Sequence, residues 1–540
     1  MSKLTPLALV ALLVVPVFAA EEKPRLIVTI SVDHMRADYL VRFRPYFGEG
    51  GFKRLLEGGA DYRDCHYQHG LTITAPGHAT ILSGVNAKVH GIIANDWLDN
   101  GTLAGGNAVE DTSTPLVGLP PKADRFPNAA WAAKSGRSPT RYLATTVGDQ
   151  LKARYPSAKV FGVADKDRSA ILMAGRKADG AYWTEEGIFV TSTYYRTTLP
   201  AWAQAFNERR NAAQYFGKTW DRLREKAIYD KVQGPDDAPG EESTAGMPAT
   251  LPKTVPAGSY GAFDRTPWNN EIVAEMAMRC LEAEELGQDD IPDLLAIGFS
   301  QTDAAGHAYG PDSHEVMDSY LQLDRVLAGL IEFFDAKVGA GRWVAVLTAD
   351  HGVMPLPERA QAEKGQGGRP SLGEVDAAVK KALDARFGEL PDNLEWVVRD
   401  GRAYHLHPGA LRVAKVPAEK LEAEIKAALL RVPWIAAAYT REELTGAVAL
   451  DAMGEAMRLS YYPARSPDVM FVQKPYFTGR KAGVDHGTPY DYDNHVPQLW
   501  YGAGVKPGLH TERVAVEDIA PTMAGLLGLD LPEAKGKRLF

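Results

Sequence analysis

Acidic and histidine side chains repeatedly follow apolar stretches of this chain. Asp33 follows the run RLIVTISV, and Asp350 and His351 follow WVAVLT. Asp303 and His307 follow LLAIGFS and are expected in a glycine-bearing loop. Continuous apolar runs of this length are typical of buried parallel strands. Open α/β sheets bind ligands beyond the carboxyl ends of such strands. A single Asp at such a place is often a turn residue, but three acidic strand ends together predict a cation site, because carboxylates and imidazoles are zinc ligands.

A hydroxyl group stands at the predicted start of a helix in GLTITAPGHATILSG, residues 70–84. Thr74 is expected to be the N-cap, with Pro76 in the first turn. The first turn of a helix offers free backbone N–H groups and the positive end of the dipole, which suit a phosphate or sulfate. Taken alone, the stretch favours an ordinary capping threonine, and only the acids and histidines elsewhere in the chain favour an anion site.

Polar side chains elsewhere in the chain could bind the same anion. Lys166 and Arg168 follow the predicted strand KVFGVA in the sequence DKDR. In an extended segment these two side chains point the same way and could clamp a terminal phosphate. A solvated charge cluster is the alternative reading. Asn95, in HGIIANDW, could donate a hydrogen bond to the anion or simply form a turn.

The candidate metal ligands sort into two sets. One set lies beside Thr74 and the other includes the histidine of DHGTPY: Asp33, Asp350 and His351, and Asp303, His307 and His486. Two cations about 4 Å apart stabilise the attacking and leaving oxygens of a phosphoryl displacement. Thr74 would then be the nucleophile, since a metal lowers the pKa of a bound hydroxyl. The sequence has no GxxxxGK[ST] phosphate-binding loop.

Several ordered motifs resemble the alkaline phosphatase superfamily, specifically the PafA-like bacterial phosphatases with a threonine nucleophile. The motifs are SVDHMRADYL, TAPGHAT, ANDW, DKDR, DAAGH, TADHG and DHGTPY. The resemblance implies an α/β three-layer sandwich with a mainly parallel central sheet plus insertions. It makes Thr74 the phosphorylated nucleophile and assigns Asn95, Lys166 and Arg168 to the substrate phosphate. It also implies two Zn²⁺ ions, held by the two sets above together with Thr74, and gives His495 no ligand role.

The same residues separate the chain from related branches. Sulfatases of the superfamily carry C/S-x-P-x-R, whereas this chain has Thr74-Ala-Pro-Gly-His78. Nucleotide pyrophosphatases and phosphodiesterases share T-x-P-x-H but generally lack the Lys-x-Arg pair, whose charge suits a dianionic monoester. We therefore expect a phosphomonoesterase acting on small-molecule esters, with weak diester hydrolysis. A non-catalytic periplasmic metal or phosphate binder is the alternative from another class.

Composition and the N-terminal segment limit the partners and the location. The 540 residues carry a net charge of −9, which argues against a general nucleic-acid binder. Residues 1–19 combine Lys3, a short apolar core and small residues, as in a cleaved signal peptide. We expect a periplasmic or secreted protein with no membrane anchor after cleavage. The family resemblance favours a monomer.

The catalytic domain is expected over residues 20–540. Residues 98–140 and 180–270 are predicted insertions over the active site, and residues 357–460 a small α/β insertion, after which DVMFVQ (468–473) returns to the core. A helix is expected over 39–56. Cys65 and Cys280 could pair or stay free. Acidic residues such as Asp491 and Asp493 are compatible with calcium, but no calcium site can be placed.

Overall fold

A computed structural model describes residues 23–119, 136–210, 212–242, 244, 246–256, 259–391 and 394–540. The predicted signal peptide and part of the predicted 98–140 excursion lie outside these ranges. Within them, no helix combines the length and the apolar character that crossing a membrane requires. Cys65 and Cys280 are both free and buried, so the pairing that the sequence left open is absent from this part of the chain.

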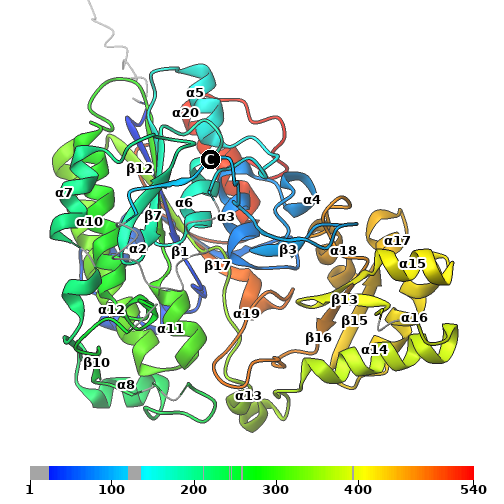
Figure 1. Cartoon of the computed structure of the whole chain (residues 1–540). Helices are drawn as coiled ribbons and strands as arrows, with labels where there is room; N and C mark the ends of the chain where they lie inside the picture. Colours follow the sequence, from blue (N-terminus) through cyan, green and yellow to red (C-terminus); the bar gives the residue numbers. More distant parts are fainter. Residues whose placement is uncertain are drawn as a thin grey trace, which may run out of the picture.

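A ten-stranded sheet organises the chain, in the order β18-β2-β17-β12-β1-β11-β6-β7-β8-β5 (Figure 1). Its strands are β1 (Leu26–Val32), β2 (Ala60–His66), β5 (Leu116–Val117), β6 (Val160–Ala164), β7 (Gly180–Glu185), β8 (Ile188–Ser192), β11 (Asp293–Phe299), β12 (Trp343–Thr348), β17 (His495–Gly502) and β18 (Gly508–Ala515). The central strands β12, β1, β11, β6 and β7 are parallel to one another, and antiparallel pairs flank them. This confirms the predicted α/β class with a mainly parallel centre.

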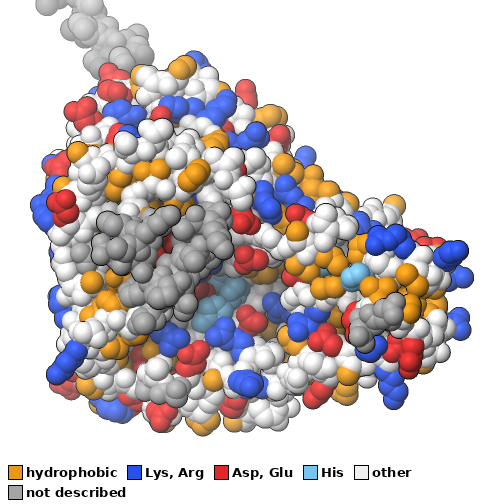
Figure 2. Space-filling view, viewed as in Figure 1, with side chains coloured by type: hydrophobic (Ala, Val, Ile, Leu, Met, Phe, Trp, Pro, Cys, Tyr) orange, Lys and Arg blue, Asp and Glu red, His pale blue; other side chains and the backbone are white. Residues whose placement is uncertain are grey.

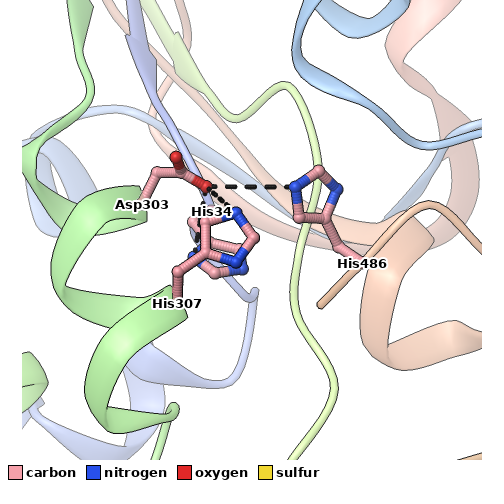
Figure 3. Close-up of side chains that lie close together, drawn as sticks. All are labelled: His34, Asp303, His307 and His486. Carbon is pink, nitrogen blue, oxygen red and sulfur yellow. Dashed lines mark ion pairs between the residues drawn. The ribbon is translucent and has the colours of Figure 1, made fainter. Parts of the chain in front are cut away.

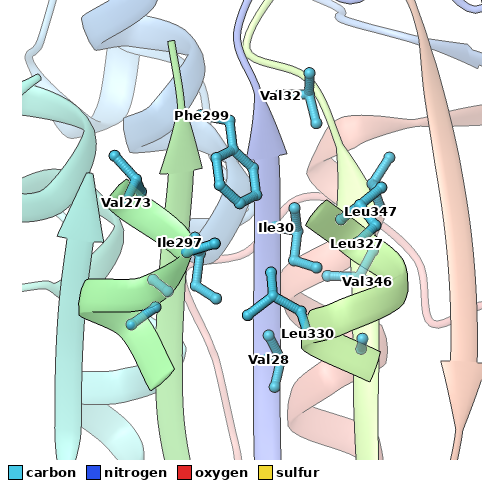
Figure 4. Packing of buried hydrophobic residues seen from close by; sticks show 14 of the residues in the cluster. Val28, Ile30, Val32, Val273, Ile297, Phe299, Leu327, Leu330, Val346 and Leu347 are labelled. Carbon is cyan, nitrogen blue, oxygen red and sulfur yellow. The ribbon is translucent and has the colours of Figure 1, made fainter. Parts of the chain in front are cut away.

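Strand β1 lies at the middle of the sheet and is buried along its whole length. Its neighbours β11 and β12 are also buried throughout. Side chains such as Ile30, Ile297 and Leu347 pack against helices on the sheet face (Figure 4). Burial on both faces explains why these strands read as continuous apolar runs rather than alternating ones. Since the three strands run parallel, the residues that follow them meet at one edge.

Helices cover both faces of the sheet (Figure 1). One layer contains α2 (Phe52–Gly58), α7 (Ala201–Arg209), α8 (Lys226–Gln233), α10 (Trp268–Ala283) and α12 (His314–Phe334), continued by η5 (Asp335–Gly339). The other contains α3 (Thr74–Ser83), α5 (Val147–Arg154), α6 (Asp167–Ala174), η6 (Val516–Asp518) and α20 (Ile519–Leu527). The remaining helices of the main body are α1 (Tyr39–Arg42), η1 (Arg44–Tyr46), α4 (Ala87–His90), η4 (Ala212–Tyr215), α9 (Gly261–Asp264), α11 (Gln301–Tyr309), α13 (Pro357–Lys364) and α19 (Asp491–Asn494). Two strand pairs lie outside the large sheet: β3 (Asp96–Leu98) with β4 (Gly105–Asn107), and β9 (Thr219–Trp220) with β10 (Ala249–Thr250).

A small lobe lies beside the main body (Figure 1). Its four-stranded antiparallel sheet has the order β13-β14-β16-β15. The strands and helices of this lobe are β13 (Val397–Asp400), β14 (Ala403–Leu406), β15 (Ile435–Thr440), β16 (Val469–Gln473), α14 (Leu372–Phe387), α15 (Pro408–Ala414), α16 (Ala418–Leu430), α17 (Arg441–Thr445) and α18 (Ala452–Leu459). The expectation that residues 468–473 return to the main sheet is wrong, because β16 pairs with β14 and β15.

Two further expectations from the sequence are also wrong. The helix predicted over 39–56 is broken into α1, η1 and α2. Pro45 lies in η1, and a Cβ atom on Gly51 would come 2.2 Å from the carbonyl oxygen of Asp324, so the chain needs a glycine and a turn there. The predicted 180–270 insertion begins too early, since β7 and β8 belong to the main sheet.

Candidate active site and metal-binding groups

Thr74 is the first residue of α3, a helix whose residues are all buried. The N-cap is Ile73 and not Thr74 as predicted, and the Thr74 hydroxyl makes no capping hydrogen bond. The capping role passes to Asn95, whose Oδ1 accepts the Ala75 N–H at 2.9 Å. Thr74 Oγ1 instead lies 3.5 Å from His351 Nε2. The hydroxyl is therefore free to face the site rather than the helix backbone.

The first predicted ligand set comes together beside Thr74. His351 Nε2 lies 3.4 Å from both Asp33 Oδ1 and Asp350 Oδ2. His351 Nδ1 donates to the Gly352 carbonyl at 2.9 Å, which leaves Nε2 as the unprotonated nitrogen. Burial lowers the pKa of His351 to about 3, so the ring is neutral, which is the form that binds a metal.

The second predicted set also comes together, but on a helix. Asp303 and His307 were expected in a loop, whereas they lie one turn apart on α11, on the same helix face. His307 Nε2 is 3.2 Å and His486 Nε2 4.0 Å from Asp303 Oδ1 (Figure 3). His307 Nδ1 donates to the Val484 carbonyl and His486 Nδ1 to the Thr72 carbonyl, each at 2.8 Å. Both rings therefore turn Nε2 toward Asp303.

Electrostatics within the second set favour a carboxylate that stays ionised. Burial would raise the pKa of Asp303, but Lys166 and His307 outweigh it and hold that pKa well below its usual range. Burial lowers the pKa of His307, but the Asp303 carboxylate reverses the shift and raises it. Burial lowers the pKa of His486, and the neighbouring His351 and His307 lower it further.

Lys166 bridges the two ligand sets. Its Nζ lies 2.6 Å from Asp33 Oδ2 and 2.6 Å from Asp303 Oδ2. Burial would lower the pKa of Lys166, but the Asp303 and Asp33 carboxylates outweigh it and raise the pKa. The ammonium group is thus a fixed positive charge between the sets.

Arg168 lies near this ammonium but not in the predicted arrangement. Lys166 is the residue before α6 and Arg168 is inside the first turn of that helix, so the two are not in one extended segment. The positive charge of Arg168 opposes the rise in the Lys166 pKa that the Asp303 and Asp33 carboxylates cause. Its guanidinium lies 3.6 Å from Asp167. The helix start, rather than an extended strand, brings both cations to the site.

A further observation indicates that the two ligand sets suit divalent cations. Asp33 Oδ1, Asp303 Oδ1 and Asp350 Oδ2 are buried and have no hydrogen-bond partner in the described part of the chain. Buried carboxylate oxygens without a partner are costly, and cations relieve that cost. Asp33, Asp303 and His351 bring ligand atoms within 4.8 Å of one another. Carboxylate and imidazole donors in this number suit zinc.

The site lies in a hollow of the surface. Figure 2 shows histidine side chains at the bottom of a depression between the main body and the small lobe, with acidic and basic side chains around it. The small lobe also reaches the site directly, because the Arg402 guanidinium donates to the His486 carbonyl oxygen at 2.5 Å. A ligand entering the hollow would meet charged side chains before reaching the metal-binding groups.

Comparison with known proteins identifies the family. Residues 27–489 match the family described as type I phosphodiesterase / nucleotide pyrophosphatase. The chain belongs to this family. Alkaline phosphatase PafA of Elizabethkingia meningoseptica is 33% identical over 96% of this chain and 94% of its own length. Alkaline phosphatase PhoV of Synechococcus elongatus is 32% identical over 94% of this chain and 91% of its own.

Solved structures agree with these sequence matches. The crystal structure of PafA superimposes with a TM-score of 0.87 at 31% identity, covering 96% of this chain and 99% of PafA. Murine ectonucleotide pyrophosphatase/phosphodiesterase 5 shares the fold at 16% identity and a TM-score of 0.51. The predicted resemblance to PafA-like alkaline phosphatases is confirmed, and this family member is a phosphatase enzyme.

Sequence reasoning missed two histidines of this family member. His34 lies with Asp303, His307 and His486 in one group of potential ligand atoms. His78 Nδ1 donates to the Thr74 carbonyl oxygen at 2.8 Å and lies 3.4 Å from Asp350 Oδ2. The signal for His34 was present, because Asp33-His34 repeats the Asp-His order found after β12. His495, which the resemblance left without a ligand role, lies in a separate group with Asp64 and His66.

Proposed function

We propose that this protein is a zinc-dependent phosphomonoesterase that hydrolyses small-molecule phosphate monoesters through a phospho-threonine intermediate. The observation that carries the proposal is the meeting of Thr74, at the start of a buried helix, with two groups of carboxylate and imidazole donors. Asp33, Asp350 and His351, with Thr74, would hold one ion, and Asp303, His307 and His486 the other. Two such ions supply positive charge for the attacking and leaving oxygens of phosphoryl transfer.

The chain's own groups then perform the remaining tasks. Thr74 Oγ1 would attack phosphorus, forming an Oγ1–P bond as the P–O bond to the alcohol breaks and the threonine proton ends on that alcohol. Water would then break the Oγ1–P bond, returning a proton to Oγ1 and releasing inorganic phosphate. Its position at the helix start directs the dipole toward the anion. Asn95 is held by its Oδ1 on the Ala75 N–H, which leaves its NH₂ group to donate to a phosphate oxygen. Lys166 and Arg168 offset charge on the non-bridging oxygens.

The positive charges of Lys166 and Arg168 favour a monoester substrate over a diester. A terminal phosphate of a monoester carries about one more negative charge than a diester, and one unit charge at about 4 Å is worth roughly 4 kcal/mol at an effective dielectric constant of 20. The family match describes phosphodiesterases, so diester hydrolysis is the second candidate function. The relatives named alkaline phosphatases and the Lys166–Arg168 pair support monoesters as the main substrates.

A comparison of two substrates tests the proposal. Purified, zinc-loaded protein is assayed at alkaline pH with an aryl phosphate monoester and a methyl aryl diester. We expect the larger kcat/KM for the monoester, and Arg168→Ala should lower it about 100-fold more for the monoester than for the diester. Arg209→Ala, at the exposed end of α7, is the matched control and should leave kcat/KM unchanged for both substrates. A diester preference in the wild type, or equal losses in Arg168→Ala, would contradict the monoester assignment.

The sequence also supports export of this enzyme. We propose that residues 1–19 direct the chain to the periplasm or outside the cell, where phosphate esters are met without a nucleic-acid or membrane partner. A monomer is proposed on the family resemblance. N-terminal sequencing of the protein from a cell envelope fraction tests cleavage after residue 19, and light scattering tests the monomer. An intact N-terminus in the cytosol would refute export.

A further inference from the structure

His34 has a strained backbone directly after β1. Its φ angle is +72°, in the left-handed region. Such a conformation is uncommon for a residue with a side chain and costs on the order of 1–2 kcal/mol. Strain of this kind persists where the surrounding structure imposes it, and it concentrates at functional sites. The strained residue directly follows Asp33, and its imidazole lies close to Asp303, His307 and His486.

The imidazole of His34 is buried without the partners that a buried ring needs. The residue is 2% exposed, and neither ring nitrogen has a hydrogen-bond partner among the residues that the structure describes. Its Nδ1 lies 3.5 Å from Asp303 Oδ1, too far for a hydrogen bond. By contrast, His307 and His486 each donate Nδ1–H to a backbone carbonyl. An unpaired buried imidazole is costly, and a cation bound at this ring would relieve that cost.

The His34 ring converges on the second ligand set. Asp303 and His307 extend from α11, while His34 and His486 approach from other segments (Figure 3). One ligand atom from each of the four residues lies within 4.8 Å of those of the other three. Position 306 makes room for the ring, because a Cβ atom on Gly306 would come 2.4 Å from His34 Nδ1. The four donors thus face one small volume.

We propose that His34 is a fourth protein donor to the cation held by Asp303, His307 and His486. The inference rests on the proposed function, which needs a cation at this place, and adds a residue to its ligand set. One carboxylate and three imidazoles match the number and type of ligands in four-coordinate zinc sites, whereas catalytic zinc usually has three protein ligands. With His34 as a fourth donor the site would hold the ion more tightly, and a substrate oxygen would reach it as a fifth ligand, a coordination number that catalytic zinc can adopt.

Replacement of His34 tests this role without relying on activity. His34→Gly adopts a φ of +72° without strain and His34→Asn tolerates it, so neither variant should unfold the site. The matched control is His69→Asn, because His69 is also buried with no hydrogen-bond partner on either ring nitrogen in the described chain, yet lies against Glu517 rather than in the site. Zinc affinity is measured by competition with a chelator, and Co²⁺-substituted protein is compared by its visible absorption spectrum.

The expected result separates the second ion from the first. Wild type and His69→Asn should bind two ions with the same two affinities. Both His34 variants should bind one ion unchanged and the other at least about tenfold more weakly, with an altered Co²⁺ spectrum. Metal-free His34→Gly should be as stable as wild type or more so, because it loses strain and an unpaired ring.

The outcomes distinguish the two proposals. Unchanged affinity and unchanged Co²⁺ spectra in both His34 variants would overturn the role of His34 and leave the proposed function intact. A metal-free His34→Gly that is less stable but binds both ions normally would also overturn it, in favour of a structural histidine. A wild-type protein that takes up fewer than two ions would instead refute the proposed function.

Discussion

Replacing Lys166 by methionine tests the link between the two ligand sets. The Lys166 ammonium lies 2.6 Å from a carboxylate oxygen of each set, and its side chain is 18% exposed against 0% for Asp33 and 9% for Asp303. Lys166→Met keeps much of the side-chain volume but leaves two buried carboxylates without their common counter-charge. Breaking a buried ion pair by removing one partner typically costs about 3–5 kcal/mol. We expect Lys166→Met to lower the free energy of unfolding of the metal-free protein by this amount.

Zinc should restore most of that stability. A cation bound by either set supplies positive charge to the same carboxylates, so the deficit of Lys166→Met should fall to about 1 kcal/mol at saturating zinc. By linkage, the same free energy appears as tighter zinc binding to the variant. The measurement is urea unfolding of wild type and variant, each with chelator and with zinc.

Lys152→Met is the matched control for this experiment. Lys152 is also 18% exposed and pairs with Asp179 at 2.8 Å, but neither residue belongs to a ligand set. Its loss of stability should be the same with and without zinc. The reasoning about Lys166 is refuted if metal-free Lys166→Met lies within about 1 kcal/mol of wild type, or if zinc leaves its deficit unchanged.

Three other substitutions test the helix, the nucleophile and a buried acid. A Cβ atom on Gly77 would lie 2.3 Å from the Asp350 carbonyl oxygen, so Gly77→Ala should lower kcat/KM at least about tenfold, whereas Gly329→Ala, with no atom within 4 Å among the described residues, should not. Thr74→Ala should lower kcat at least about 10³-fold, while Thr74→Ser keeps a hydroxyl and should retain measurable turnover; turnover unaffected by Thr74→Ala would exclude it as nucleophile. Burial raises the pKa of Asp493 to about 8, and a raised carboxyl pKa favours folding at low pH and loses that contribution as pH rises from about 4 to 8. Urea unfolding should therefore show wild type losing up to about 1.4 kcal/mol per pH unit relative to Asp493→Asn between pH 6 and 8, and parallel curves would contradict the raised pKa.

The sequence alone determined the framework that carries the site. Apolar runs at 26–32, 294–299 and 343–348 predict buried parallel strands because a strand covered on both faces needs apolar side chains on both. Because parallel strands end at one edge of a sheet, the sequence alone predicts that Asp33 and Asp350 lie near each other. Thr74 at a helix start and the candidate ligands beyond each strand followed from the same local rules.

Assignment of strands to sheets needed the tertiary structure. DVMFVQ reads as a core strand from its composition, yet β16 completes the small sheet of the lobe. Likewise, GAYWTE was assigned to an insertion but extends the main sheet as β7. Strand pairing depends on contacts between distant segments, and a strand's own residues do not specify its partner.

The direction of individual side chains was also decided only by the fold. A sequence cannot show that Asp303 and His307 share a helix face rather than a loop, or that Lys166 reaches both Asp33 and Asp303. It places His34 next to a ligand but cannot give the φ of +72° that turns its ring toward Asp303. Local sequence sets which donors are available, whereas backbone angles and packing across the sheet edge decide which of them converge.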